Sequence, residues 1–191
     1  DLQAASAAAR AQGLRVHLDG ARIFNAAVAL GVDAAEIAAC SDTVTFCLSK
    51  GLSCPAGSVF CGSEEDVEEA RRWRKRLGGA MRQPGLLAAA GLVALDTMVD
   101  RLAEDHANAR TLAEGLSELP GIHCDLSRVQ TNIVYFDVTR MTGRAFEDEC
   151  RARGLLGGAT DANRLRFVTH SGISAADVQS ALAICSEVVG A

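Results

Sequence analysis

Apolar and polar positions follow two different periods along the first part of the chain, and each period predicts its own kind of element. Three short runs rich in β-branched and other apolar residues, 14–18, 43–48 and 57–62, have the length and composition of buried strands. Segments with apolar positions at helical spacing predict helices at 2–12, 21–30, 33–40, 64–77 and 85–118. Strands that alternate with helices are typical of α/β proteins.

The connections between these segments predict how the strands pair. Only about eight residues separate 43–48 from 57–62, which is too few for a helical crossover. We therefore expect the last two strands to be antiparallel.

A different pattern begins after Pro120-Gly121, the clearest boundary in the sequence. The segments beyond it predict strands at 122–126, 131–138 and 164–169, and helices at 142–153 and 174–188. We expect two domains: residues 1–119, part of an α/β domain that includes a long helix at 85–118, and residues 120–191, a small α+β domain.

Composition narrows the possible functions. The net charge is −5, so a nucleic-acid partner is not favoured, and no apolar run approaches the ~18 residues of a membrane span. The seven cysteines form no CxxC pair, which argues against a metal site and favours a reducing, cytoplasmic compartment.

The chemistry of the first domain is expected to centre on Lys50 and Asp19. Lys50 follows the strand 43–48 in a glycine-containing turn, and Asp19 follows the strand 14–18 in another. Because ligands of α/β folds gather at the carboxyl ends of the strands, both side chains are expected at one edge of the sheet. A lysine and a carboxylate placed together there would suit a cofactor held as a Schiff base.

Each of these residues also has a plainer explanation. A lysine beyond a strand is most often a solvated surface residue, and Asp-Gly is a common turn dipeptide. Arg22 could face the same site or pair with a surface carboxylate, and His17 is more often a satisfied histidine of the core than a catalytic base. The small residues Ser49 and Gly51 leave room beside Lys50 for a bulky group.

Four sequence blocks favour the functional interpretation of these residues over the plainer explanations. They resemble the threonine aldolase family of enzymes that depend on pyridoxal 5′-phosphate (PLP). The blocks are His17-Leu-Asp-Gly-Ala-Arg-Ile-Phe-Asn-Ala-Ala27, Cys47-Leu-Ser-Lys-Gly-Leu52 with Pro55 and Gly57-Ser58, Leu77-Gly-Gly-Ala-Met-Arg-Gln83, and Arg164-Leu-Arg-Phe-Val-Thr-His170. The resemblance implies an aspartate-aminotransferase-like fold, of which this chain would hold the second half of the large PLP-binding domain and the small C-terminal domain.

The resemblance also implies a role for several residues. Lys50 would form the Schiff base with PLP, Asp19 would hold the pyridine nitrogen, and Arg22 would lie at the phenolic oxygen. Arg166 would bind the α-carboxylate of an amino-acid substrate, which suits a planar two-pronged donor. Further positions expected near the cofactor are His17, Ser49 and Arg82.

Some assignments stay open at this point. Arg164 competes with Arg166 for the carboxylate, although the frame Arg-Phe-Val-Thr-His favours Arg166. No catalytic base is assigned, and His170 is expected to support Arg166. The basic run 71–76 lies near the cofactor phosphate in the family, while most such runs are solvated helix faces and a nucleic-acid patch is the least favoured explanation.

The family also has features that this sequence does not show. No glycine-rich phosphate loop precedes Asp19, and the family's ring-stacking residue lies upstream of the segment that matches residue 1. We therefore expect the chain to be the C-terminal portion of a longer protein, or a truncated product.

The expected activity is cleavage of L-threonine or L-allo-threonine, or related β-hydroxy-α-amino acids, to glycine and an aldehyde. The alternatives are β-elimination or another PLP reaction on the same scaffold, and a non-catalytic fragment that binds a partner or oligomerises. A dimer or tetramer with sites near the subunit interface is implied by the resemblance alone.

Overall fold

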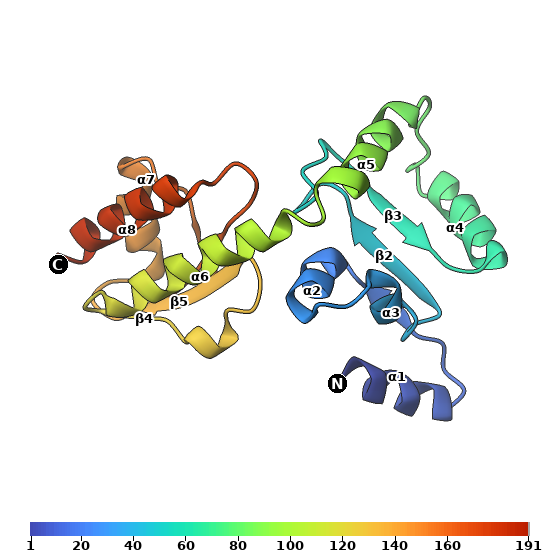
Figure 1. The fold of residues 1–191 in the computed structure, drawn as a ribbon, viewed down its shortest axis with the longest axis horizontal. Coiled ribbons are helices and arrows are strands. Elements are labelled where there is room, and N and C mark those ends of the chain that lie inside the picture. The colour runs from blue at the N-terminus through green and yellow to red at the C-terminus, as the bar shows by residue number, and fades with distance from the viewer. Residues whose placement is uncertain (191) are drawn as a thin grey trace. The chain divides into compact units, whose positions relative to one another are not determined.

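A three-stranded sheet forms the centre of the first part of the chain (Figure 1). Its strands are β1 (His17–Asp19), β2 (Thr43–Cys47) and β3 (Ser58–Cys61), in the order β1-β2-β3. In the computed structural model, which describes residues 1–190, β1 and β2 are parallel and β2 and β3 antiparallel. The antiparallel pairing predicted for the last two strands is confirmed.

Five helices accompany this sheet, and their ends lie where the sequence places capping residues. They are α1 (Leu2–Ala11), α2 (Ile23–Leu30), α3 (Ala34–Ala38), α4 (Glu64–Arg76) and α5 (Gly85–Thr97). Gly31 ends α2 with φ +66°, a conformation that glycine adopts without a steric penalty. Asp33 and Glu36 form a reciprocal capping box at α3, and the Ser63 hydroxyl accepts a hydrogen bond from the Asp66 N–H at α4.

The apolar core of this part is small. Its main buried cluster, Leu48, Leu52, Cys54 and Ala94, joins the end of β2 and the loop beyond it to α5. Gly91 lets α5 approach closely, since a Cβ there would lie 3.1 Å from Leu48 Cδ1. α5 therefore packs against the segment that carries Lys50 and supports it.

A second sheet, with four antiparallel strands, forms the rest of the chain. Its order is β4 (Ile122–His123), β5 (Ile133–Val138), β7 (Arg164–Val168) and β6 (Gly158–Ala159). Three α-helices, α6 (Leu102–Glu118), α7 (Gly143–Ala152) and α8 (Ala175–Val189), and the short 3₁₀ helix η1 (Leu126–Arg128) complete it. Phe136 packs edge-on against Phe146 and Phe167, with ring centroids 5.8 and 5.0 Å apart, at the centre of a much larger core.

The predicted helix 85–118 is wrong as a single element, because it is broken at residues 98–101. The Thr97 hydroxyl donates to the Val93 carbonyl oxygen (2.8 Å), and β-branched Thr97 and Val99 both disfavour continued helix. The chain divides there into two units, Asp1–Arg101 and a second one that starts at Leu102. The domain boundary predicted at 119/120 is therefore too late, because α6 packs on β4, β5 and α8.

Three smaller expectations differ from the structure. The first strand begins at His17 rather than residue 14, and Leu14 is exposed. The predicted strand 122–126 is confined to Ile122–His123, because Asp125 instead caps η1 through its hydrogen bond from Ser127 N–H. The two-residue strand β6 has no counterpart in the sequence prediction.

A buried polar cluster joins α6 to the ends of β5 and β7. The Thr169 hydroxyl donates to the Asp105 backbone oxygen (2.6 Å), and the Asn132 side-chain amide donates to the Thr169 backbone oxygen (2.8 Å). All three residues are at most 2% exposed. Because buried polar groups are costly unless paired, these bonds hold α6 in place against the start of β5 and the end of β7.

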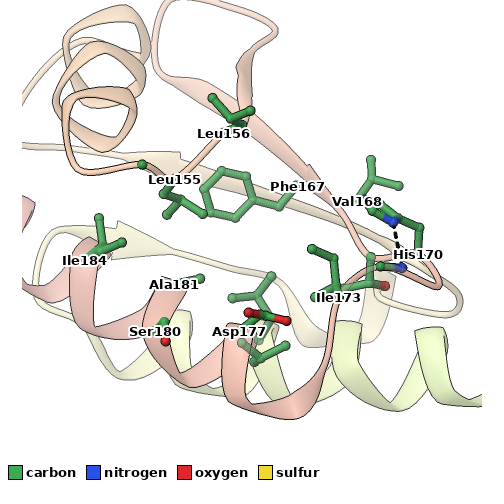
Figure 2. Close-up of a pocket in the computed structure, with 15 residues that line it drawn as sticks. Leu155, Leu156, Phe167, Val168, His170, Ile173, Asp177, Ser180, Ala181 and Ile184 are labelled. Carbon is green, nitrogen blue, oxygen red and sulfur yellow. Dashed lines mark hydrogen bonds between the residues drawn. The ribbon is translucent and has the colours of Figure 1, made fainter.

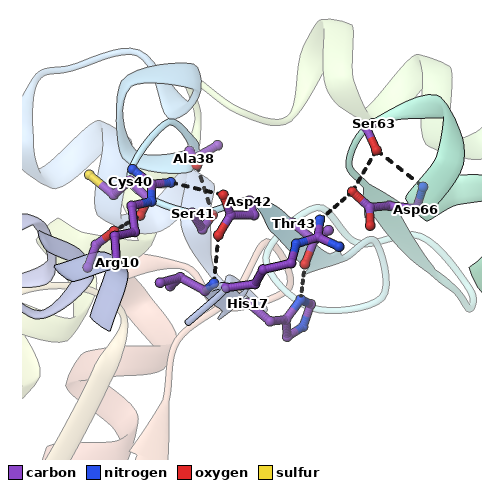
Figure 3. A network of polar contacts seen from close by, with 12 residues as sticks. Arg10, His17, Ala38, Cys40, Ser41, Asp42, Thr43, Ser63 and Asp66 are labelled. Atoms are coloured by element: carbon purple, nitrogen blue, oxygen red, sulfur yellow. Dashed lines mark hydrogen bonds and ion pairs between the residues drawn. The ribbon is translucent and has the colours of Figure 1, made fainter. Parts of the chain in front are cut away.

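A surface network ties the first strand to its neighbours (Figure 3). Asp42 accepts from the Val16 backbone N–H (2.6 Å) and lies 3.4 Å from the Arg10 guanidinium, while Asp66 of α4 accepts from Arg15 (2.7 Å). These contacts link α1, α4 and the start of β2 to the segment that leads into β1.

Candidate functional site

The first group of predicted site residues lies at the carboxyl ends of β1 and β2. Asp19 is opposite Thr45 in the parallel register, and Lys50 follows the end of β2 by three residues. The turn after Asp19 is bonded to β2, since Gly20 N–H donates to the Thr45 carbonyl oxygen (2.8 Å) and Cys47 N–H to that of Ala21 (3.3 Å). The structure therefore brings Asp19 and Lys50 to the same edge of one sheet.

Glycine at position 20 makes this close approach of the turn to β2 feasible. An added Cβ would lie 2.9 Å from Val44 Cγ2 and 3.2 Å from the Thr45 carbonyl oxygen. The Asp19 carboxylate accepts a hydrogen bond from Ala21 N–H (3.1 Å) and is exposed, so it points away from the buried side of the turn. Lys50 and its neighbour Ser49 are also exposed, which leaves the amine accessible.

Arg22 has the feature that points most directly to a missing ligand. It precedes the first residue of α2, its side chain is half-buried, and its Nε is buried without a hydrogen-bond partner. A buried guanidinium N–H without an acceptor is costly. An oxygen of a bound molecule would satisfy it, so the residues present here fit a cofactor that carries such an oxygen.

His17 has well-defined partners of its own. Its Nδ1 lies 2.9 Å from the Thr43 hydroxyl, its Nε2 lies 3.5 Å from that of Thr45, and its ring stacks on Phe60 at 6.1 Å between centroids. These contacts favour a supporting role on the sheet face, two residues before Asp19. Its predicted place beside the cofactor stays a prediction.

Arg82 lies outside regular structure, in the exposed segment between α4 and α5. Two non-glycine residues have a positive φ: Ser53 (59°) in the loop after β2, three residues after Lys50, and Gln83 (50°), next to Arg82. Non-glycine residues in this conformation are strained and cluster at functional loops. No contact between Arg82 and the residues of the Lys50 edge is described, so its role also stays a prediction.

Arg164 and Arg166 lie on β7 in the second unit and point to the same, exposed face of its sheet. Arg164 is paired: its Nε and one terminal nitrogen lie 2.9 and 2.8 Å from the two oxygens of Asp137. This ion pair lowers the pKa of the Asp137 carboxyl and raises the pKa of Arg164. Arg166 is opposite Tyr135 on one side and Gly158 on the other, without an acidic residue in either position.

The sequence analysis missed Asp137 and Tyr135, the cross-strand neighbours of Arg164 and Arg166 on β5. Both line a polar pocket of about 530 Å³ on this face, together with His123, Arg128 and Arg164. The alternation along β5 would have placed them on the outer face, but only the cross-strand register shows that Asp137 pairs with Arg164. His170 does not contact Arg166 in any described bond; its Nδ1 instead accepts from Gly172 N–H (3.1 Å).

The carboxyl ends of β1 and β2 thus carry a carboxylate and an accessible lysine, and Arg22, three residues after Asp19, has a donor without a partner; this set of residues fits PLP. Comparison with known proteins identifies the family. Residues 1–139 match the model of the beta-eliminating lyase family, and the chain belongs to that family. The cofactor of such a lyase is PLP, and the resemblance to the threonine aldolases is confirmed.

Curated relatives are consistent with this assignment. The chain is 44% identical over 184 residues to the probable low-specificity L-threonine aldolase 2 of Arabidopsis thaliana, covering 95% of the chain and 52% of that protein. It is 44% identical over 165 residues to the low specificity L-threonine aldolase of Escherichia coli K12, covering 86% of the chain and 48% of that protein. The chain thus spans about half the length of the curated relatives it matches.

Solved structures show the same fold. A putative L-allo-threonine aldolase from Listeria monocytogenes superposes with a TM-score of 0.78 at 22% identity, over 98% of this chain and 55% of that one. A threonine aldolase from Leishmania major gives 0.75 at 19% identity, over 98% of this chain and 56% of that one. Separately, none of the helices between residues 1 and 190 has the length and apolar character needed to cross a bilayer.

Proposed function

We propose that this chain carries part of the active site of an aldolase that cleaves L-threonine, L-allo-threonine and related β-hydroxy-α-amino acids to glycine and an aldehyde. The observation that carries the proposal is the parallel pairing of β1 and β2, which delivers Asp19 and Lys50 to one edge of the sheet. The low-specificity L-threonine aldolases named above, at 44% identity, support the choice of substrate.

PLP, when bound, would supply an electron sink for the electron pair of the broken Cα–Cβ bond. The residues of this chain would bind and orient the reactants around it. Lys50 would hold the cofactor covalently through its amine, and Asp19 would keep the proton on the pyridine nitrogen, because a nearby carboxylate favours the charged ring. Arg22 would donate its unsatisfied Nε–H to the phenolic oxygen.

Arg166, rather than Arg164, is proposed to bind the substrate carboxylate. Arg164 is already paired in a two-pronged contact with Asp137. Arg166 points from the same face with Tyr135 and Gly158 as its cross-strand neighbours. A free, planar guanidinium is the better partner for an incoming carboxylate.

Covalent trapping tests the cofactor assignment on the chain itself. The sequence has two lysines, Lys50 and Lys75, so a borohydride-reduced PLP adduct can be located by mass spectrometry of peptides. We expect a yellow absorbance band on PLP addition and an adduct at Lys50 that Lys50→Ala abolishes and the matched control Lys75→Ala retains. An adduct confined to Lys75 or the amino terminus would contradict the proposal and favour a non-catalytic fragment.

Product analysis separates the proposed reaction from its main alternative. The family model is described as a beta-eliminating lyase, and Asp19, Lys50 and Arg166 would serve β-elimination equally well because they do not touch the bond that is cleaved. With the protein in its full native length, L-threonine should yield glycine and acetaldehyde in equal amounts. Pyruvate and ammonia from L-serine, without aldehyde from L-threonine, would establish the elimination instead.

A homo-oligomer is part of the proposal, and α5 supports it. This helix is apolar on all sides, with Leu86 83%, Leu92 69% and Val93 62% exposed, whereas a helix of that kind is usually buried. We propose that a second copy of the chain covers it. α4 has acidic residues in its first turn and basic ones in its last, so two antiparallel copies would be complementary in charge.

Sedimentation velocity tests the oligomer. The chain should sediment as a dimer or larger, and Leu92→Glu with Val93→Glu should shift it to the monomer. Leu14→Glu, a change of an equally exposed leucine that lies outside α5, is the matched control. A monomeric wild-type chain at micromolar concentration would contradict the proposed interface. A cytoplasmic, reducing location is proposed with it, since all seven cysteines are free thiols.

A further inference from the structure

A second cavity lies wholly within the second unit, between α8 and the end of β7 (Figure 2). Its volume is about 400 Å³, in the range of small-ligand pockets. None of the residues proposed to bind PLP or the substrate carboxylate lines it, and His170, which does, has no described bond to Arg166. The cavity is therefore a feature that the proposed function does not use.

The walls of this cavity are apolar. Its main apolar lining residues are Leu155, Leu156, Phe167, Ile173, Ala181 and Ile184. The Phe167 ring rests against the backbone of Gly157, where a Cβ would lie 2.0 Å from Phe167 Cε1, so a side chain at residue 157 would displace this ring. Leu156 at the rim is 72% exposed, which a bound apolar group would reduce.

Two polar groups of opposite character lie among this apolar lining, Asp177 and His170. Asp177 of α8 uses Oδ2 for the Ser174 N–H and hydroxyl (2.8 and 2.6 Å), and these bonds lower the pKa of its carboxyl. Its other oxygen remains an acceptor. His170 accepts at Nδ1 from Gly172 N–H (3.1 Å), which leaves the ring proton on Nε2 as a donor.

We propose that this cavity binds an apolar α-amino acid. The side chain would fill the space beside Phe167, the ammonium group would bind Asp177, and the carboxylate would accept from His170 Nε2–H. An amine alone or a carboxylate alone would use only one of the two polar groups. The inference does not rest on the lyase activity, because every residue in it belongs to the second unit.

Titration of the chain with L-leucine, followed by isothermal calorimetry and by amide NMR shifts, tests the proposal. We expect saturable binding with shifts at Gly172 and along the first turns of α8. Isopentylamine, which lacks the carboxylate, and 4-methylpentanoate, which lacks the amine, should each bind at least tenfold more weakly. Equal binding of either analogue, or no saturable binding of L-leucine, would overturn the proposal.

Two variants locate the site. Asp177→Asn keeps the helix cap but loses the charge, and should weaken L-leucine binding at least tenfold; Ala181→Phe should fill the cavity and abolish it. Ser117→Ala is the matched control, because Ser117 lies outside the cavity and its hydroxyl is likewise bonded to a backbone oxygen, the Glu114 carbonyl (2.7 Å). Unchanged affinity in Asp177→Asn would contradict the site. Binding that disappears in Arg166→Ala would assign the amino acid to the proposed substrate site and overturn the inference, while leaving the proposed function intact.

Discussion

At the scale of single residues, Gly20 determines how closely the Asp19 turn approaches β2. Its N–H is bonded to the Thr45 carbonyl oxygen, and the nearest atoms to an added Cβ are a core methyl group and that same backbone oxygen. Neither can move without displacing β2. The position of Asp19 relative to the Lys50 strand therefore depends on a missing side chain.

Gly20→Ala should destabilise the chain and weaken PLP binding together. Overpacking of this kind costs about 1–3 kcal/mol, because β1 must shift from β2 to relieve the contact. Urea unfolding measures the stability, and the yield of the Lys50 adduct at limiting PLP measures the binding. Gly85→Ala, at the first residue of α5 with open space around the added methyl group, is the control and should be neutral or slightly stabilising. Equal stability of the two variants would contradict the assigned role of Gly20.

At the scale of elements, we expect the hydrogen bonds between α6 and the end of β7 to contribute more to the stability of the second unit than its exposed hydrogen bonds do. Thr169→Val preserves the shape but leaves the Asp105 backbone oxygen without the Thr169 hydroxyl, at a cost of about 1–3 kcal/mol. Thr139→Val removes a similar bond, to the Gly121 carbonyl oxygen, at an exposed site where water can replace it. Chemical denaturation should show that Thr169→Val lowers the free energy of unfolding more than Thr139→Val does. A larger decrease in Thr139→Val would contradict the role of the buried cluster.

The contact between α4 and the segment before β1 predicts a dependence of stability on pH. Bonds from Arg15 and then Ser63 lower the pKa of Asp66 from 3.8 to about 2. A carboxyl whose pKa is depressed by folding stabilises the native state above its unfolded pKa, and that stabilisation is lost as the pH falls through the folded value. The difference in melting temperature between the wild type and Asp66→Asn should thus be full above pH 5 and shrink between about pH 4 and pH 2.

The corresponding control is Asp148→Asn, which removes an exposed carboxylate of α7 that lies 3.3 Å from Arg144. Its effect on the melting temperature should be small at every pH, because exposed ion pairs contribute little. If the Asp66→Asn difference is constant down to pH 2, the ion pair with Arg15 is not its source.

Sequence patterns predicted most elements because their signals are local. Asp33 and Ser63 cap the helices that follow them and Gly31 ends α2, so each of these residues acts on its own neighbours in the chain. The break at 98–101 was missed because apolar spacing continues across it. The pairing of Arg164 with Asp137 was also missed, because Asp137 is 27 residues distant in sequence and is brought next to Arg164 only by the register of β5 and β7.

The candidate site, like the secondary structure, could be predicted only in part from the sequence. The parallel pairing of two strands follows from their connection, so a common edge for Asp19 and Lys50 could be expected from the sequence. The unsatisfied Nε of Arg22 could not, because burial of one side-chain nitrogen depends on how α2 packs. The cavity beside α8 is equally a product of packing, and no motif indicates it.

At the scale of the whole molecule, the two units differ in how much apolar surface they bury. The second has a continuous core around Phe136, whereas the cluster of the first holds Leu48, Leu52, Cys54 and Ala94. Because burial of apolar area is the main stabilising contribution, the first unit should open more readily. Hydrogen exchange should show faster exchange for the amides of β1–β3 than for those of β5 and β7; the reverse order would contradict this ranking.

The free cysteines allow this ranking of the two units to be tested by chemical labelling. Cys61 is exposed and Cys54 is buried in the first unit, whereas Cys150 of α7 and Cys185 of α8 are free thiols hydrogen-bonded to each other and at most 1% exposed. A thiol reagent added during slow denaturation should therefore label Cys61 at once, Cys54 next, and the adjacent pair last. The order of labelling would show, without any engineered probe, which of the two units unfolds first.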